Sequence, residues 1–332
     1  MNKAFKNSCN QARYSRQIQV AQVGSAGQNK LQNAHVGLVG VGGLGCPVAL
    51  YLAGAGVGKI TLIDHDVVSE SNLHRQILFT QADIGESKAD IAQRRLSAHN
   101  PDVEIVSHRE PLRPDNLDDL ADADVIVDAC DNFVVSYLLS DYARERQKPL
   151  VSASVMQTHG YVGVYGFRSD TQKPCPSLRA VFPNPPQVGQ DCNSVGVIGT
   201  SAGIIGTLQA QEVLKVILGD NAQLAGQLLS LDLWTHRQSL IDFSGAPEPT
   251  VKADIITEPQ LQSDDWIIDV RSELERHAQP KQCHQAMPLS EIKISELPQN
   301  KRLVFTCASG QRALVVADKA ITAGFSSVAV LI

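Results

Sequence analysis

The chain has 332 residues, of which 43% are hydrophobic and 19% are charged, and its formal net charge is −6. This length predicts two domains, and the hydrophobic content is ordinary for proteins with packed cores. A negative net charge without a basic run disfavours nucleic acid as a partner. No apolar run in the sequence reaches the length of a membrane span.

The seven cysteines are irregularly spaced and odd in number. This pattern disfavours a disulfide framework and favours a reducing compartment. Residues 2–16 are largely polar, which is not typical of a secretory signal peptide. We therefore expect a cytoplasmic protein.

A glycine-rich loop is the first motif along the chain. The apolar run 36–39 predicts a buried parallel strand, and residues 48–53 predict a helix. Glycines let the backbone approach a phosphate, and the helix N-terminus offers unpaired N–H groups to an anion. A nucleotide-binding loop is therefore favoured over a plain glycine-rich turn. Its glycines are Gly40, Gly42, Gly43 and Gly45.

Acidic and basic residues after this loop favour chemistry on a triphosphate. The run 60–63 predicts a second strand that ends at Asp64, at the spacing typical of a carboxylate that binds a ribose. Arg75 and Lys88 follow within one βαβ unit, and such cations hold phosphates during adenylation. For either cation alone, an ordinary surface charge is the better interpretation. Their combination with the loop favours a phosphate site.

A further strand, predicted at 125–128, is followed by Asp131. Ligands in open α/β sheets bind at the carboxyl ends of strands. Mg²⁺ takes one or two carboxylates together with phosphates, so Asp131 is a candidate Mg²⁺ ligand. The alternative is that Asp131 caps the following helix.

Taken together, these residues resemble the ThiF/MoeB adenylyltransferases, relatives of the ubiquitin-activating enzymes. The resemblance covers about Arg13 to Phe243 and implies a Rossmann-like, mostly parallel α/β sheet over residues 12–243. It is carried by 13–18, the glycine loop, Asp64, 71–76, Lys88, 130–132, 196–199 and 206–210.

The resemblance implies that ATP and Mg²⁺ bind together with a small β-grasp sulfur-carrier protein that ends in Gly-Gly. The carrier carboxylate attacks the α-phosphate, and sulfur then replaces AMP to give a thiocarboxylate. Arg16 is implied to reach into the site of the partner subunit of a homodimer. The implied nucleotide-binding residues are the four loop glycines, Asp64, Ser71, Asn72, Arg75, Lys88, Asp131 and Asn132.

Family members of this kind carry a structural zinc held by two Cys-x-x-Cys pairs. Here the first pair is reduced to Cys175, because Leu178 stands where the second thiolate is needed. The segment 244–250, where the second pair belongs, has no cysteine. Since structural zinc needs four ligands, we predict no zinc at this site.

Cys192 lies near the start of a helix predicted at 197–218, a position that lowers a thiol pKa. It is similar in position to the family cysteine that links to the carrier or accepts its acyl group. A passive loop cysteine is the alternative.

The last third of the chain predicts a second unit. Segment 244–263 has the composition of a linker, and 264–332 resembles a short, incomplete rhodanese domain. In this resemblance Cys307 carries a persulfide and Arg312 assists it, with thiosulfate or a cysteine desulfurase as the sulfur source. A backbone N–H cradle around Cys307 favours a thiolate. A vestigial unit that only makes contacts is the alternative.

Three hypotheses follow. The favoured one is an ATP-dependent carrier adenylyltransferase with sulfurtransferase activity, acting in thiamin or molybdopterin biosynthesis. A nicotinamide oxidoreductase uses the same loop but leaves Arg75, Lys88 and Cys307 without roles. A non-catalytic carrier-binding protein binds a carrier without turnover.

Overall fold

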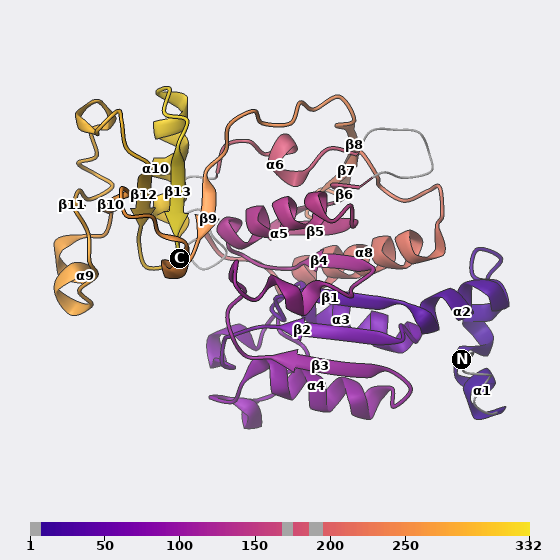
Figure 1. Ribbon diagram of the computed structural model, residues 1–332. Coiled ribbons are helices and arrows are strands. Elements are labelled where there is room, and N and C mark those ends of the chain that lie inside the picture. The colour runs from indigo at the N-terminus through magenta and orange to yellow at the C-terminus, as the bar shows by residue number, and fades with distance from the viewer. Residues whose placement is uncertain (1–7, 168–174, 186–194) are drawn as a thin grey trace.

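The computed structural model describes residues 8–167, 175–185 and 195–332 (Figure 1). These residues form two sheets, one of eight strands and one of five. The expectation of an α/β fold with a Rossmann-like, mostly parallel sheet is confirmed. Within the described ranges, no helix is both long enough and apolar enough to cross a membrane.

The first sheet has the strand order β3-β2-β1-β4-β5-β6-β7-β8. Its first five strands are parallel, and β6, β7 and β8 add to it in antiparallel fashion. The strands are β1 (His35–Val39), β2 (Lys59–Ile63), β3 (Glu104–His108), β4 (Val125–Asp128), β5 (Leu150–Met156), β6 (His159–Tyr165), β7 (Gln227–Asp232) and β8 (Arg237–Asp242).

Helices cover both faces of this sheet. In β4, Val125 and Val127 pack in the core formed with α3 and α8, whereas Ile126 packs in the core formed with α5. This alternation is the period-2 signature of a strand buried on both faces. The helices are α1 (Ser8–Ile18), α2 (Gly24–Asn33), α3 (Gly45–Ala55), α4 (Lys88–His99), α5 (Phe133–Glu145), α6 (Leu178–Val181) and α8 (Gly199–Leu218), with short 3₁₀ turns η1 (Glu70–Asn72), η2 (Gln81–Asp83) and η3 (Leu117–Leu120).

The second sheet is entirely parallel, in the order β11-β10-β12-β13-β9. Strand β9 comes first in the chain but lies at one edge of this sheet, and it falls inside the segment 244–263 that composition predicted to be a linker. Part of that segment therefore belongs to the second sheet, because Ile255 and Ile256 are buried there. The elements are β9 (Asp254–Ile256), η4 (Glu258–Gln260), β10 (Trp266–Asp269), α9 (Glu273–Ala278), β11 (Gln285–Ala286), η5 (Ile294–Glu296), β12 (Leu303–Thr306), α10 (Gln311–Thr322) and β13 (Val328–Leu331).

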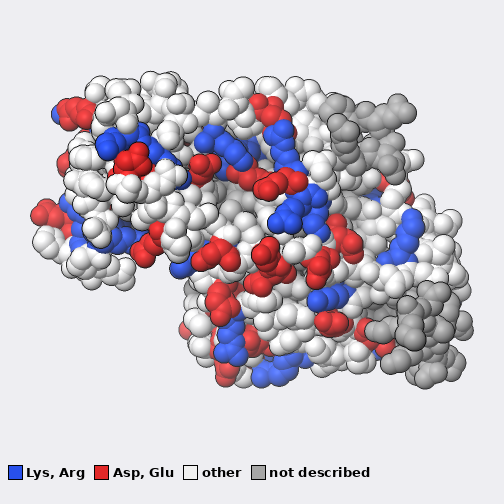
Figure 2. Space-filling model, in the orientation of Figure 1, with Lys and Arg blue, Asp and Glu red and all other residues white. Residues whose placement is uncertain are grey.

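The second sheet and its helix α10 pack directly on α5 of the first unit (Figure 1). One continuous apolar core includes Val134 and Tyr137 from α5 together with Leu314 and Ala317 from α10. The C-terminal unit therefore lies beside the first sheet, against the N-terminal part of α5 (Figure 1). On the face shown in Figure 2, basic and acidic side chains are interspersed across the middle of the molecule.

A buried ion pair organises the start of the second unit. Asp269 and Arg271 are 0% and 2% exposed, and the Arg271 Nη2 atom donates to Asp269 Oδ2 over 2.6 Å. Arg271 also donates to the carbonyl of Gln279 over 2.8 Å. Burial raises the pKa of Asp269, but the hydrogen bonds from Arg271 outweigh it and hold that pKa below its ordinary value.

We expect Arg271→Ala to lower the free energy of unfolding by about 3–5 kcal/mol, because it leaves the Asp269 carboxylate buried without its partner. Urea denaturation followed by circular dichroism measures this change. Lys293→Ala, which breaks an exposed pair with Glu296, is the control and should cost about 0–1 kcal/mol. Equal effects of the two variants would contradict the prediction.

Candidate active site

A cavity of about 460 Å³ opens at the carboxyl edge of β1, β2 and β4. This is the edge at which ligands of open α/β sheets bind. Of the predicted nucleotide-binding residues, the cavity wall includes Gly40, Gly42, Gly43, Asp64, Arg75, Lys88, Asp131 and Asn132.

Steric limits explain two of the loop glycines. Gly40 has a φ of +90°, and a Cβ there would lie 2.7 Å from the carbonyl oxygen of Ala129. A Cβ on Gly45 would lie 2.0 Å from the carbonyl oxygen of Gly40. Gly45 does not line the cavity, and its lack of a side chain lets the first residue of α3 pack closely against the backbone of the loop.

Asp64 fastens the loop to the end of β2. Its carboxylate accepts the backbone N–H of Val41 over 2.7 Å and that of Asp66 over 2.9 Å. Burial raises the pKa of Asp64, while the charge of Lys88 and the two N–H donors oppose that rise. Asp64 is 9% exposed and lines the cavity, and its role as a ribose ligand stays a prediction.

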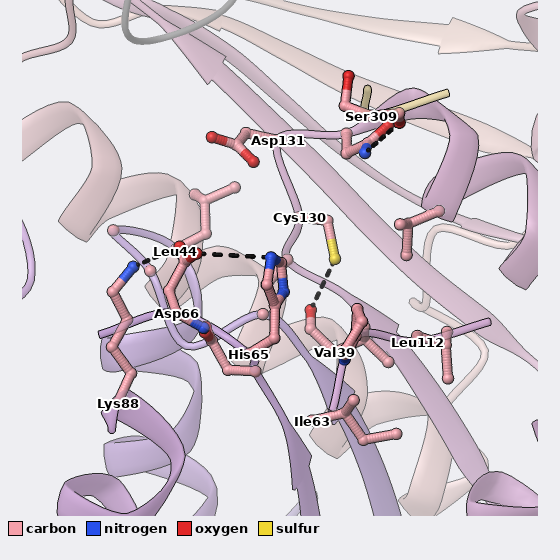
Figure 3. A pocket seen from close by; sticks show the side chains of 18 of the residues that line it. Val39, Leu44, Ile63, His65, Asp66, Lys88, Leu112, Cys130, Asp131 and Ser309 are labelled. Carbon is pink, nitrogen blue, oxygen red and sulfur yellow. Dashed lines mark hydrogen bonds and ion pairs between the residues drawn. The ribbon is translucent and has the colours of Figure 1, made fainter. Parts of the chain in front are cut away.

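Lys88 is the first residue of α4, and its ammonium group lies 2.8 Å from Asp66 Oδ2. Figure 3 shows this pair on one side of the cavity, with Asp131 on the opposite side beyond Leu44. The Lys88 side chain is buried, whereas the Asp66 side chain is 55% exposed. A buried cation beside an exposed carboxylate can exchange that partner for a phosphate.

The Arg75 side chain is oriented by hydrogen bonds to residues of the turn that precedes it. Its Nη2 atom donates to Asn72 Oδ1 over 2.6 Å, and its Nη1 atom lies 3.4 Å from the carbonyl oxygen of Ser71. Asn72 and Ser71 are not part of the cavity wall. Their observed contacts orient Arg75, which alone of the three reaches the cavity.

Asp131 and Asn132 have different environments. Asn132 caps α5 by accepting the N–H of Val134 over 3.0 Å, and it donates to the carbonyl of Ser309 over 3.2 Å. The helix cap is therefore Asn132, and the alternative in which Asp131 caps the helix is wrong. Asp131 is exposed and lines the cavity, and it forms no ion pair with any other residue that the structure describes.

The magnesium ion implied by the family resemblance fits this donor set in part. An exposed carboxylate such as Asp131 supplies the hard oxygen that Mg²⁺ prefers. The described residues contain no group of three or more His, Cys, Asp or Glu side chains arranged to hold a metal. Phosphate oxygens would have to complete the coordination, as is usual for Mg²⁺ in nucleotide sites.

The Cys307 loop of the second unit reaches the same cavity. Cys307 follows β12 and is 1% exposed, and Ala308 and Ser309 line the cavity wall. Lys281 donates to the carbonyl of Cys307 over 3.1 Å. The residues that follow Cys307 therefore lie at the same cavity as the glycine loop, although Cys307 itself is not part of the cavity wall.

Arg312, the second residue of α10, is paired with Glu275 over 2.5 and 2.7 Å. These hydrogen bonds raise the pKa of Arg312, burial lowers it, and the nearby Cys307 raises it again. Arg312 is thus a fixed cation next to the cysteine loop, although it does not line the cavity.

The zinc implied by the family resemblance does not fit the residues present. The Cys175 thiol donates to the carbonyl of Val164 over 3.2 Å, and Leu178 is buried at the start of α6. With one cysteine instead of four, the two stretches 175–178 and 244–250, both within the described residues, supply no zinc coordination sphere.

Cys192 and Arg16 complete the set of predicted site residues. Cys192 is outside the described residues. Arg16 is exposed on α1 and does not contribute to the cavity of its own chain. The expected reach of Arg16 into a partner subunit stays a prediction.

Sequence reasoning missed several residues that line the cavity. Asp66 stands two residues after Asp64, and this Asp-x-Asp spacing could have identified it as the partner of a nearby lysine. His65 and Gln76 also line the cavity, and they stand next to Asp64 and Arg75 in the sequence. Glu110, Arg113 and Ser154 depend on tertiary contacts that no local pattern reveals.

Comparison with known proteins gives consistent matches over the first unit. The model described as the ThiF family matches residues 14–251. The adenylyltransferase and sulfurtransferase MOCS3 of Aedes aegypti is 46% identical over 224 residues, which cover 67% of this chain and 50% of that protein. The sulfur carrier protein adenylyltransferase of Thermus thermophilus is 44% identical over 223 residues, which cover 66% of this chain and 82% of that protein.

The chain thus spans about half the length of the MOCS3 relatives that it matches. Among solved structures, Escherichia coli MccB in complex with MccA-N7isoASN superposes with a TM-score of 0.61 at 22% identity, covering 74% of each chain. That likeness supports the fold of the eight-stranded unit. From the family match and the identity to its relatives, the chain belongs to the ThiF family.

Proposed function

We propose that this protein is an ATP-dependent adenylyltransferase of a small sulfur-carrier protein. The observation that carries the proposal is the cavity, which gathers the glycine loop, Asp64, Arg75 and Lys88 at one sheet edge. Two relatives whose names include adenylyltransferase match the unit that contains this cavity. A nicotinamide site would need cations only for the pyrophosphate of the dinucleotide, whereas adenylation also needs them for the departing β- and γ-phosphates.

The chemistry asks for positioning and charge stabilisation rather than for a side-chain base. The carboxylate at the carrier C-terminus is already ionised at neutral pH. Its oxygen attacks the α-phosphorus, the bond from that phosphorus to the β-phosphate oxygen breaks, and pyrophosphate leaves. Arg75 and Lys88 stabilise the charge that moves onto the departing phosphates, while Asp64 binds the ribose and the glycine loop admits the phosphates.

Asp131 would be the protein ligand of a Mg²⁺ ion that arrives with ATP, and such an ion neutralises phosphate charge. Asn132 holds the end of α5 beside it.

The second unit would supply sulfur. A persulfide on Cys307 attacks the carbonyl carbon of the carrier adenylate, AMP leaves, and a thiol then cleaves the resulting disulfide to release a thiocarboxylate. Cys307 is then left in a disulfide with the attacking thiol. An external dithiol would reduce this disulfide, and thiosulfate or a cysteine desulfurase would reload the freed Cys307 thiolate. Arg312 provides a positive charge beside the loop, and Cys192 is the candidate second thiol.

The partners that we propose are a carrier of the ThiS or MoaD type that ends in Gly-Gly, and a second copy of this chain. In such a homodimer Arg16, exposed on α1, would complete the site of the other subunit. The proposed setting is cytoplasmic thiamin or molybdenum cofactor biosynthesis.

Carrier-dependent exchange of pyrophosphate into ATP tests the proposal. We expect exchange with either a ThiS-type or a MoaD-type carrier, and its loss when the final Gly-Gly of that carrier is removed. The active carrier would also identify the pathway. Tight NAD binding without exchange would support the oxidoreductase, and carrier binding without exchange would support the non-catalytic protein.

We expect Arg75→Ala to reduce the exchange rate by roughly 10²–10³-fold, because a preorganised charge at the departing phosphates is lost. The matched control is Arg94→Ala on α4, whose side chain is 68% exposed and pairs with Asp83 over 3.6 Å. That control should exchange at the rate of the unmodified protein. A similar rate in both variants would remove Arg75 from the phosphate site.

We expect Cys307→Ala to retain pyrophosphate exchange and to lose thiocarboxylate formation from thiosulfate. Mass spectrometry of the carrier measures the gain of sulfur. Cys283→Ala, at a half-buried cysteine outside the loop, is the control and should give the normal yield. An unchanged yield in Cys307→Ala would mean that this unit does not donate the sulfur.

A further inference from the structure

The segment that should carry zinc ligands is held together by a different kind of contact. Two stretches of chain meet against α5, one around Ser177 before α6 and one around Glu248 after β8. These are the stretches in which the family resemblance places the two cysteine pairs. In this chain they are connected through carboxylate, hydroxyl and guanidinium groups.

Glu248 makes the first connection. Its two carboxylate oxygens accept the backbone N–H of Ser177 over 2.8 Å and the Ser177 hydroxyl over 2.6 Å. The same carboxylate forms an ion pair with Arg144 on α5. Ser177 also caps α6 by accepting the N–H of Ala180 over 3.1 Å. One glutamate thus joins the start of α6, the segment after β8 and α5.

Asp141 makes a second connection between the same three stretches. It accepts two hydrogen bonds from Arg179, at 3.2 Å from Nε and 2.8 Å from Nη2, and it pairs with Lys252 over 2.9 Å. Arg179 is 4% exposed, and its guanidinium lies 4.2 Å from the ring centroid of Tyr137. Because Asp141 and Arg144 are three residues apart on α5, they lie on one face of the helix.

We propose that this network is a metal-free clamp that takes the structural place of the zinc site. The clamp consists of Asp141, Arg144, Ser177, Arg179, Glu248 and Lys252. Asp141, on α5, bonds to Arg179 in the first stretch and to Lys252 in the second. Glu248, in the second stretch, bonds to Ser177 in the first and to Arg144 on α5. A zinc ion with four ligands would join the two stretches through a single atom.

Burial makes the clamp stronger than an ordinary surface pair. Exposed ion pairs contribute little, because water and salt screen them. Ser177 and Arg179 are buried, so removing their acceptors leaves buried donors without partners. The clamp should therefore resist chelators and thiol oxidation, to which a thiolate-bound zinc is exposed.

Thermal unfolding of the full chain tests the clamp. We expect Glu248→Gln to lower Tm by roughly 4–10 °C, as the loss of a few kcal/mol does in a chain of this size. Glu258→Gln, at an exposed glutamate of the same connecting region, is the matched control and should leave Tm unchanged. If Glu248→Gln does not fold, Ser177→Ala removes a single hydroxyl and should show a smaller decrease.

Two further measurements decide between the clamp and a metal. Incubation of the unmodified protein with 1,10-phenanthroline should leave Tm unchanged, and elemental analysis should find zinc far below one atom per chain. Stoichiometric zinc, or a Tm that falls with chelator, would overturn the proposal. So would equal Tm values for Glu248→Gln, Ser177→Ala and the Glu258→Gln control.

Discussion

The buried carboxylate of Asp64 is the contact on which the geometry of the cavity depends. It receives an N–H from the glycine loop after β1 and an N–H from the chain just beyond β2. Removing it from water is costly, and the charge of Lys88 with the two N–H donors offsets part of that cost. The glycine loop, Asp64 and Lys88 are therefore fixed relative to one another before any ligand arrives.

The cations of the cavity are positioned differently from each other. Arg75 is supported by the neutral acceptor Asn72, so its charge stays available to an anion. Lys88 is paired with Asp66, so an incoming phosphate must replace a carboxylate there. Because the Lys88–Asp66 pair must be broken, the net binding free energy is smaller than that of the phosphate–lysine contact alone. In the absence of ligand, the same pair prevents Lys88 from being a buried charge without a partner.

The parts of the fold that could be predicted are those that local pattern encodes. The strand at 36–39, the glycine loop and the acid at Asp64 follow one another within a few residues, so their order along the chain already specified their arrangement. The helix predicted at 197–218 is observed as α8 over Gly199–Leu218. It starts at a glycine because a Cβ there would lie 2.2 Å from the carbonyl oxygen of His74.

The parts that could not be predicted depend on distant contacts. Strand β9 has only three residues, and the surrounding glycine and proline gave the whole region the composition of a linker. The bond from Asn132 to Ser309 joins residues far apart in the chain, and nothing near Asn132 indicates it. The pairing of Glu248 with Ser177 also depends on a distant contact. The missing cysteines predict that no zinc binds there, but they do not predict which side chains connect the two stretches instead.

The shared wall between the nucleotide cavity and the Cys307 loop has a kinetic consequence. Ala308 and Ser309 line the cavity in the same chain that contains the glycine loop. A group delivered by that loop would act at an effective concentration set by the fold rather than by the amount of protein in solution. Transfer between the two centres would then be independent of dilution, and a reactive intermediate would have little time to meet water.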